Sequence, residues 1–160
     1  MSLAGSAPAF LTDLDLRAIG QGRWLVLAPF KVRSAVLEAD LSVPQGFETD
    51  LASVPRLPFV YWTVGARARK GATVHDYLYQ FQPVSRQQAD AVFYELAALE
   101  EGTIVAGLMW SGVRIGGWIT WRRHATRRHR FDNARVERRA TEYMLRAPNP
   151  PQAPWKWPQP

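Results

Sequence analysis

The stretch from Gly71 to Gly102, GATVHDYLYQFQPVSRQQADAVFYELAALEEG, decides the fold of this chain. Ser85 stands three residues before Gln88, the spacing of a capping box at a helix N-terminus. A proline shortly before this box marks a break in the chain. The pattern predicts one helix from about Ala72 to Phe81 and a second from about Arg86 to Glu101. Because the loop between them is short, we expect an antiparallel helical hairpin.

Three polar residues of this hairpin are expected to meet. His75 lies six residues before the end of the first predicted helix, and Asp90 lies five residues after Ser85. At a rise of ~1.5 Å per residue, the two side chains are about equally far from the turn, so they can stand side by side across the hairpin. Tyr79 follows His75 by four residues and lies on the same helical face.

The His75–Asp90 pair has two interpretations. In the catalytic one, the carboxylate orients the imidazole and stabilises its charged form, so that His75 deprotonates a water molecule. Asp76 projects ~100° away around the helix and could ligate a metal beside the base. In the structural one, His75, Asp90 and Tyr79 form a buried polar cluster that pins two helices together. The residues alone leave both interpretations open.

A second polar motif, TDLASVPR, lies ahead of the hairpin at residues 49–56. Asp50 and Ser53 are polar within an apolar stretch, so one interpretation places them in the same pocket as His75, with Asp50 as a further metal ligand. The other interpretation is local: Thr49 or Asp50 caps a short turn that ends before the proline. Ser53 lies in no nucleophile-elbow sequence, which argues against a serine hydrolase.

The remaining elements predict an α+β domain over residues 13–121: a small N-terminal antiparallel sheet, the helical hairpin and two further helices. Alternating apolar residues predict strands over Arg23 to Ser34 and Val36 to Val43, and Pro29 indicates an edge or a bulge. Residues 1–12 are small and apolar without period and are expected to form an extended arm. Ile104 to Trp121 is expected to be a buried helix packed on the hairpin rather than a membrane anchor.

The positive charge of the chain is concentrated near its C-terminus. Residues 122–146 hold nine arginines against three acidic residues, a surplus that equals the net charge of +6. We expect this segment to continue as a basic helix, which is either simply solvated or makes nonspecific contact with nucleic acid or an acidic surface. The candidate contact residues are Arg122, Arg123, Arg127 and Arg128.

Residues 147–160, APNPPQAPWKWPQP, form a proline-rich tail that is expected to be extended. Trp155 and Trp157 on such a tail suggest docking into pockets of neighbouring subunits, because exposed tryptophans are costly. The alternative is that the tail folds back over apolar surface of its own domain.

Composition narrows the function classes further. A chain of 160 residues corresponds to one domain with appendages. It contains no cysteine, which excludes disulfides, thiolate metal sites and cysteine nucleophiles. The N-terminal residues lack the positive region and long apolar core of a signal peptide.

Three strings in fixed order resemble a domain family of unknown function common in tailed phages and prophages. They are VPQGFETDLASVPRLP, GATVHDYLYQ and SRQQADAVFYEL, and the resemblance extends from about Trp24 to Trp121. It implies a virion-associated or structural protein located in the virion or the host cytoplasm. Its partners would be other virion proteins or further copies of itself, bound through the arm and the tail.

The string HDYLY is also similar to the HD-x-x-Y motif of secreted and parvoviral phospholipase A2 enzymes. That resemblance implies metal-assisted ester hydrolysis used in entry or lysis. His75 would be the base, Asp90 its partner, Tyr79 a supporting hydrogen-bond donor and Asp76 a ligand of calcium. Where those enzymes carry a glycine-rich calcium loop, this chain has TVGARARKG.

Overall fold

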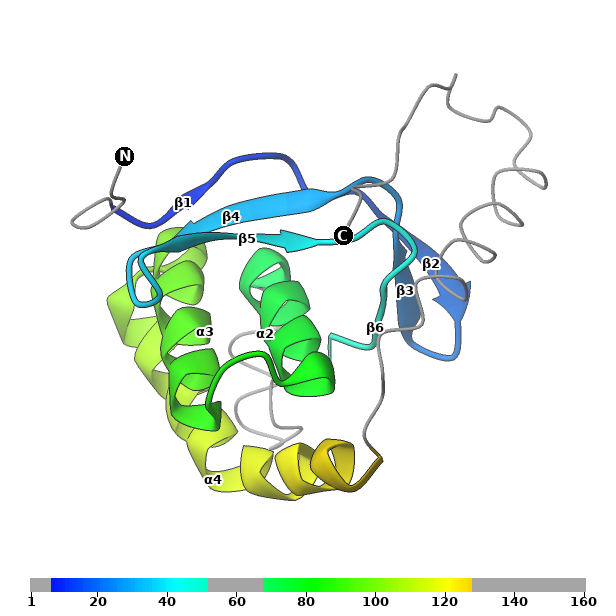
Figure 1. Cartoon of the computed structure of the whole chain (residues 1–160). Coiled ribbons are helices and arrows are strands. Elements are labelled where there is room, and N and C mark those ends of the chain that lie inside the picture. The colour runs from blue at the N-terminus through cyan, green and yellow to red at the C-terminus, as the bar shows by residue number, and fades with distance from the viewer. Residues whose placement is uncertain (1–6, 52–67, 128–160) are drawn as a thin grey trace.

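Small antiparallel sheets are followed by three helices in the computed structural model, which describes residues 7–51 and 68–127 (Figure 1). This confirms the predicted α+β class. One sheet has the order β1-β4-β5 and the other β2-β3-β6. The strands are β1 (Ala9–Phe10), β2 (Leu16–Gly20), β3 (Arg23–Val26), β4 (Phe30–Ser34), β5 (Ala39–Val43) and β6 (Glu48–Thr49). The helices are α2 (Arg69–Phe81), α3 (Arg86–Glu101) and α4 (Thr103–Arg127).

The run from Arg23 to Ser34, predicted as one strand, is divided between the two sheets. It forms β3 and β4, and Pro29 lies in the break between them. Proline has no N–H to donate to a sheet, which explains why pairing stops there. β4 then pairs antiparallel with β5 from Phe30 opposite Val43 to Ser34 opposite Ala39.

The turn between β4 and β5 is fixed by a carboxylate from α3. This turn includes Val36, which was predicted to be the first residue of the second strand. Glu95 accepts hydrogen bonds from the Ser34 hydroxyl and from the backbone N–H groups of Ala35 (3.1 Å) and Val36 (3.2 Å). The strand therefore begins at Ala39 rather than Val36. Glu95 thereby ties the sheet to the helical hairpin.

Three strands, β1, β2 and β6, were not expected from the sequence. β2 pairs with β3 through a two-residue turn in which Gln21 and Gly22 have φ values of 54° and 70°. A turn with both residues left-handed suits a tight hairpin, but glutamine is not its usual first residue, so the signal is weak. β1 lies within the segment predicted to be an extended arm and pairs with β4. Phe10 of β1 stacks on Phe30 of β4 with ring centroids 6.2 Å apart.

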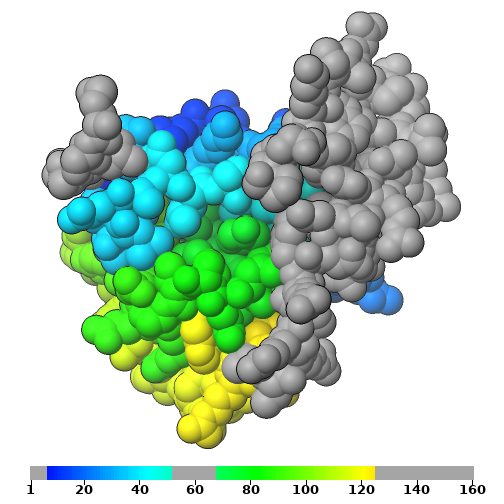
Figure 2. All heavy atoms as spheres, viewed as in Figure 1, coloured from blue at the N-terminus to red at the C-terminus, as the bar shows by residue number. Residues whose placement is uncertain are grey.

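The helical hairpin has the predicted boundaries at its turn. Ser85 accepts from the Gln88 N–H, and the Gln88 side chain accepts from the Ser85 N–H, so the capping box is confirmed. The helices α2 and α3 lie side by side beneath the β1-β4-β5 sheet (Figures 1 and 2). The hydrophobic core of the domain includes Val26, Phe30, Val32, Val43, Val74, Leu78, Val92, Phe93 and Leu96.

Helix α2 begins three residues earlier than predicted, at Arg69, because its first turn is capped by another helix. Ala68 offers no capping side chain. The Glu100 carboxylate, from the last turn of α3, accepts from the N–H groups of Lys70 (3.1 Å) and Gly71 (2.9 Å). An anionic acceptor at a helix N-terminus satisfies unpaired donors and is favoured by the helix dipole.

Helix α4 differs from the expected buried helix, because only one of its faces is covered. Ala106, Met109 and Val113 are buried against α3, whereas Ile104 is 82% and Ile115 75% exposed. Apolar residues occupy both faces of α4, so composition does not reveal which face packs. No helix in the described residues has the length and hydropathy needed to cross a membrane.

The sequence predicted an apolar helix that ends near residue 121 and a basic helix that follows it. In the structure the two form one continuous helix. α4 passes through residues 121 and 122 without a break and is described as far as Arg127. Arg122 and Arg123 are exposed on it. The rest of the predicted basic helix with Arg128, and the tail with Trp155 and Trp157, lie outside the described residues.

Candidate functional site

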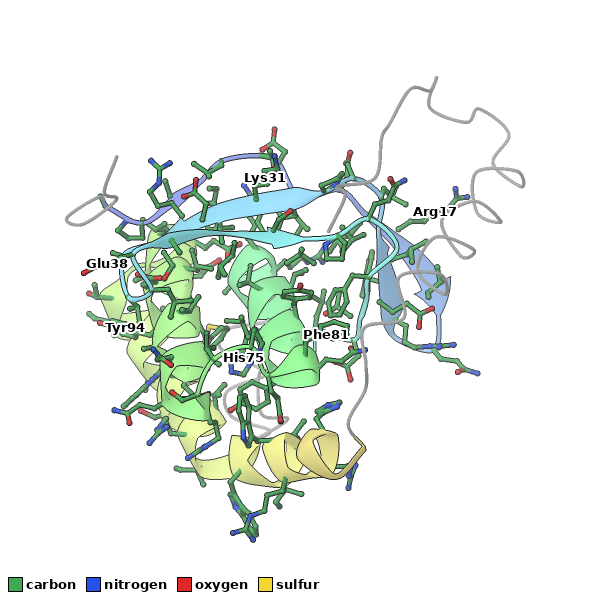
Figure 3. The ribbon with its side chains drawn as sticks, in the orientation of Figure 1. Arg17, Lys31, Glu38, His75, Phe81 and Tyr94 are labelled. Atoms are coloured by element: carbon green, nitrogen blue, oxygen red, sulfur yellow. The ribbon has the colours of Figure 1, made fainter. Side chains whose placement is uncertain are left out.

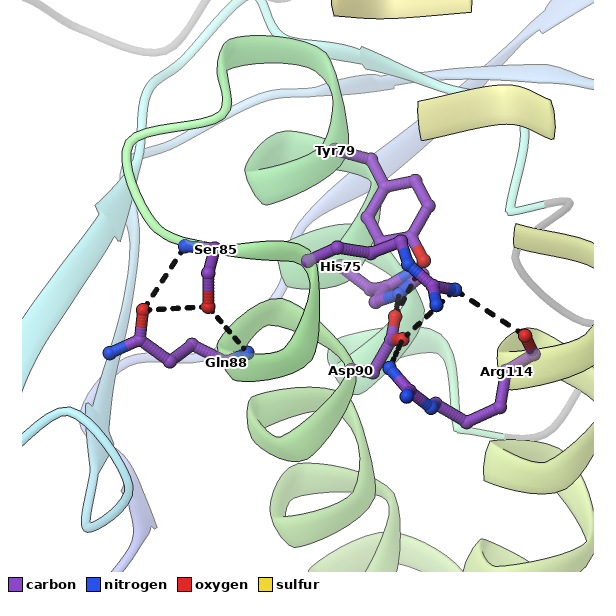
Figure 4. Close-up of polar contacts among 7 residues, drawn as sticks. His75, Tyr79, Ser85, Gln88, Asp90 and Arg114 are labelled. Atoms are coloured by element: carbon purple, nitrogen blue, oxygen red, sulfur yellow. Dashed lines mark hydrogen bonds and ion pairs between the residues drawn. The ribbon is translucent and has the colours of Figure 1, made fainter. Parts of the chain in front are cut away.

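A buried carboxylate, Asp90, joins the three helices. His75 Nε2 lies 3.1 Å from Asp90 Oδ1, and the Tyr79 hydroxyl donates to the same oxygen at 2.5 Å (Figure 4). The hydrogen bond predicted across the hairpin is thus present. Asp90 is fully buried and His75 is 2% exposed; Figure 3 shows His75 between α2 and α3 in the interior of the domain.

Two arginines complete the cluster. Arg114 Nη1, from α4, donates to Asp90 Oδ2 at 2.9 Å, and Arg86 Nη1 lies 3.6 Å from that oxygen. Neither arginine was expected from the sequence as a partner of Asp90. A signal was available, because Arg114 is the single charged residue between Glu101 and Arg122. A lone charge in an apolar helix needs a partner within the fold.

The surroundings of Asp90 keep it ionised. Burial alone opposes the charge, but hydrogen bonds from His75, Tyr79 and Arg114 together outweigh burial and lower the pKa of Asp90. Burial, and then the nearby carboxylate, raise the pKa of Tyr79, so its hydroxyl remains a protonated donor. The cluster therefore holds one carboxylate surrounded by donors.

His75 is held in its neutral form. Burial lowers the pKa of His75 and outweighs the opposing attraction of Asp90. The two guanidinium groups reduce that attraction, because they already balance the carboxylate charge. Since Asp90 is an acceptor, Nε2 carries the proton and Nδ1 carries a lone pair. Nδ1 is buried and has no hydrogen-bond partner in the described part of the protein.

Aromatic packing fixes the orientation of the imidazole. The ring centroid of His75 lies 4.0 Å from that of Tyr79 and 5.0 Å from that of Phe93. Trp121 packs edge-on against Tyr79 at 5.0 Å, and its carbonyl accepts from Gln82 at 2.8 Å. The C-terminal part of α4 thus closes over the end of α2.

Gly117 makes room for the Tyr79 hydroxyl, because a Cβ at this position would lie 2.5 Å from that oxygen. We expect Gly117→Ala to lower the free energy of unfolding by about 1–3 kcal/mol, as overpacking displaces Tyr79 from Asp90. Gly116→Ala is the matched control: its Cβ would meet nothing within 4 Å, so the better helix propensity should stabilise by up to ~1 kcal/mol. Urea unfolding measures both, and equal effects would contradict the close contact.

The predicted metal ligands do not assemble a calcium site among the described residues. Asp76 Oδ2 accepts a hydrogen bond from the Thr49 hydroxyl, whose oxygen in turn accepts from the Leu51 N–H at 3.1 Å. Asp50 is exposed at the end of β6. Calcium requires six to eight oxygen ligands, and no group of three or more candidate ligand side chains occurs in residues 7–51 and 68–127. Ser53 lies outside the described residues.

The neutral state of His75 predicts how stability depends on pH. The unfolded residue titrates near 6.5 and the folded one below it, so between these values the unfolded chain binds more protons. The free energy of unfolding should therefore fall as the pH drops from 7 to 5, and more steeply in the wild type than in His75→Gln. The stability that ionised Asp90 contributes is lost only at lower pH, because the pKa of Asp90 is lowered. Titration of Glu100 affects the stability of the wild type and of His75→Gln equally, so it does not alter the comparison. Parallel curves from urea unfolding would show that burial does not depress this pKa.

Comparison with protein families gives one match. A family described as "Protein of unknown function (DUF1353)" matches residues 24–113. This range runs from β3 into the first half of α4 and contains His75, Tyr79, Arg86 and Asp90, whereas Arg114 lies one residue beyond it. Neither the curated proteins nor the solved structures contain a match.

Proposed function

Because the chain belongs to the DUF1353 family, whose description assigns no activity, its function has to be inferred from the site, and we propose that it is a hydrolase in which His75 activates water. One observation carries this proposal. His75 is buried and neutral, with Nε2 held by Asp90 and the lone pair of Nδ1 unpartnered among the described residues. A general base needs this state: an unprotonated nitrogen on an imidazole whose tautomer is fixed.

The proposed reaction is the hydrolysis of an ester. When a water molecule and the ester reach the buried His75 Nδ1, this nitrogen accepts a proton from the water as the water oxygen attacks the ester carbonyl. The imidazolium that forms is stabilised by the ionised Asp90 through Nε2–H, and the proton is then passed to the leaving alkoxide. Tyr79 and Arg114 do not touch the reacting atoms; they hold the Asp90 carboxylate in position. No step is assigned to a metal, because the described residues do not form a calcium site.

The test is release of fatty acid from mixed phospholipid micelles by the purified protein, measured with calcium and with a chelator. Activity in either condition supports the hydrolase, and the comparison reports the metal requirement. A protein that releases no fatty acid in either condition and shows no calcium binding by isothermal titration would leave the polar cluster with a structural role alone.

A second candidate function is that of a virion-associated structural protein in a phage particle, located in the virion or the host cytoplasm. The observation that favours it is the exposed apolar face of α4, where Ile104, Leu108 and Ile115 are 57–82% exposed. Apolar patches of this kind commonly mark protein interfaces. Mass spectrometry of purified particles tests this role, because a structural subunit should be present in them. The two candidates are compatible, since a particle can carry an enzyme.

A further inference from the structure

Arg86 and Arg114 are the partly exposed members of the Asp90 cluster. Their side chains are 25% and 33% exposed, whereas the carboxylate between them is fully buried. Both Nη1 atoms lie within 3.6 Å of the same oxygen, Asp90 Oδ2. Two positive groups are therefore held together beside a single negative one.

Contacts within residues 7–51 and 68–127 use only a minority of the hydrogen-bond donors of these two groups. A guanidinium carries five N–H donors in a planar fork. Arg114 donates to Asp90 through Nη1, and Arg86 donates through Nη1 to the Arg114 carbonyl oxygen at 3.3 Å. Arg86 also interacts with the Tyr79 hydroxyl. Both side chains are partly exposed, so a ligand can approach the two guanidinium groups from solvent.

The charge around this pair is not balanced by other described residues of α3 and α4. Helix α4 contains no acidic residue among its 25 positions. In α3, Glu95 is bonded to the β4–β5 turn, Glu100 to the first turn of α2 and Glu101 to the Ala68 N–H. Arg86 is the first residue of α3, where the helix dipole adds further positive potential. The pair keeps a surplus of positive charge at a partly buried position.

Both guanidinium groups are also held in place before any ligand arrives. Arg114 lies over the Trp110 ring, with its Cζ 5.9 Å from the ring centroid, and Arg86 is fixed by the carbonyl of Arg114. Little side-chain entropy remains to be lost on binding. A phosphoryl group has several charged oxygens, so it can accept hydrogen bonds from two guanidinium groups at once. The two oxygens of a planar carboxylate are matched by a single guanidinium group.

We propose that Arg86 and Arg114 bind a phosphoryl oxyanion at the solvent side of the Asp90 cluster, and that the substrate of the hydrolase carries this group. The identity of the substrate rests on the proposed hydrolysis, but anion binding is measured without turnover. The probe is inorganic phosphate, titrated calorimetrically against chloride at equal ionic strength. We expect saturable binding to the wild type that weakens at least tenfold in Arg86→Gln.

Two further variants make the experiment specific. Arg33→Gln is the matched control, because Arg33 forms an exposed ion pair with Asp40 on the sheet; its phosphate affinity should equal that of the wild type. Arg86→Lys retains the charge next to Asp90 but loses the planar fork, so it should fold and bind phosphate with reduced affinity. Circular dichroism confirms that each variant is folded.

A second ligand distinguishes between two sources of the phosphoryl group, a lipid and a soluble ester. Short-chain phosphatidylglycerol, used below its critical micelle concentration, should bind with the same dependence on Arg86 if the group belongs to a lipid; binding of inorganic phosphate alone would assign it to a soluble ester. Phosphate binding without hydrolysis would remove the proposed function and leave the anion site standing. Hydrolysis without Arg86-dependent phosphate binding, or equal phosphate affinity in wild type and Arg86→Gln, would overturn the site.

Discussion

Asp90→Asn is expected to lower the free energy of unfolding by about 3–5 kcal/mol. The substitution removes the buried charge while Arg114 and Arg86 keep theirs, and breaking a buried ion pair from one side leaves an uncompensated charge. The amide would also direct a donor toward neighbours that are themselves donors: Tyr79 and a guanidinium. The measurement is urea unfolding at pH 7, followed by circular dichroism.

The chain provides a matched control for this variant. Asp40→Asn makes the same chemical change in an exposed ion pair with Arg33. Exposed pairs contribute little to stability because water and salt screen them, so this variant should unfold almost as the wild type does. A loss below about 1 kcal/mol for Asp90→Asn, similar to that of the control, would mean that the cluster does not hold the three helices together.

His75→Gln is expected to reduce the rate of ester hydrolysis by about 10²–10⁴ fold, the usual contribution of a general base. Glutamine is neutral and can still donate to Asp90, so the cluster keeps its charge balance. It cannot accept a proton from water near neutral pH. The loss should therefore appear in kcat, with KM little changed, in the fatty-acid release assay.

His124→Gln is the control for the activity measurement, because it makes the same substitution on α4 outside the Asp90 cluster. It should retain the wild-type rate. A His75→Gln protein that is folded by circular dichroism and as active as the His124→Gln protein would show that His75 is not the base. The hydrolytic activity would then have to be assigned elsewhere.

The central part of the fold could be predicted because local and tertiary signals agree there. The capping box at Ser85 set the start of α3, and the helical rise placed His75 opposite Asp90. The structural interpretation of the sequence also placed Tyr79 in this cluster, where its hydroxyl donates to Asp90. These contacts depend only on helix geometry and a short loop, so they follow from residue spacing.

Features that depend on tertiary packing could not be predicted in the same way. Arg114 reaches Asp90 only because α4 packs antiparallel to α3, and no local pattern specifies which face of α4 turns inward. The exposure of Ile104 and Ile115 has the same origin. The split at Pro29 was indicated as an irregularity, but the assignment of β3 and β4 to different sheets depends on long-range pairing.

The capping of α2 by Glu100 has a consequence for the order in which the chain folds during synthesis. The N–H groups at Lys70 and Gly71 are synthesised before the carboxylate that accepts their hydrogen bonds. Helix α2 therefore lacks this N-terminal cap at first and gains it only when the last turn of α3 has formed. Nascent chains that end before Glu100 should hold α2 only weakly, and the two helices should become protected from hydrogen exchange together as one cooperative unit.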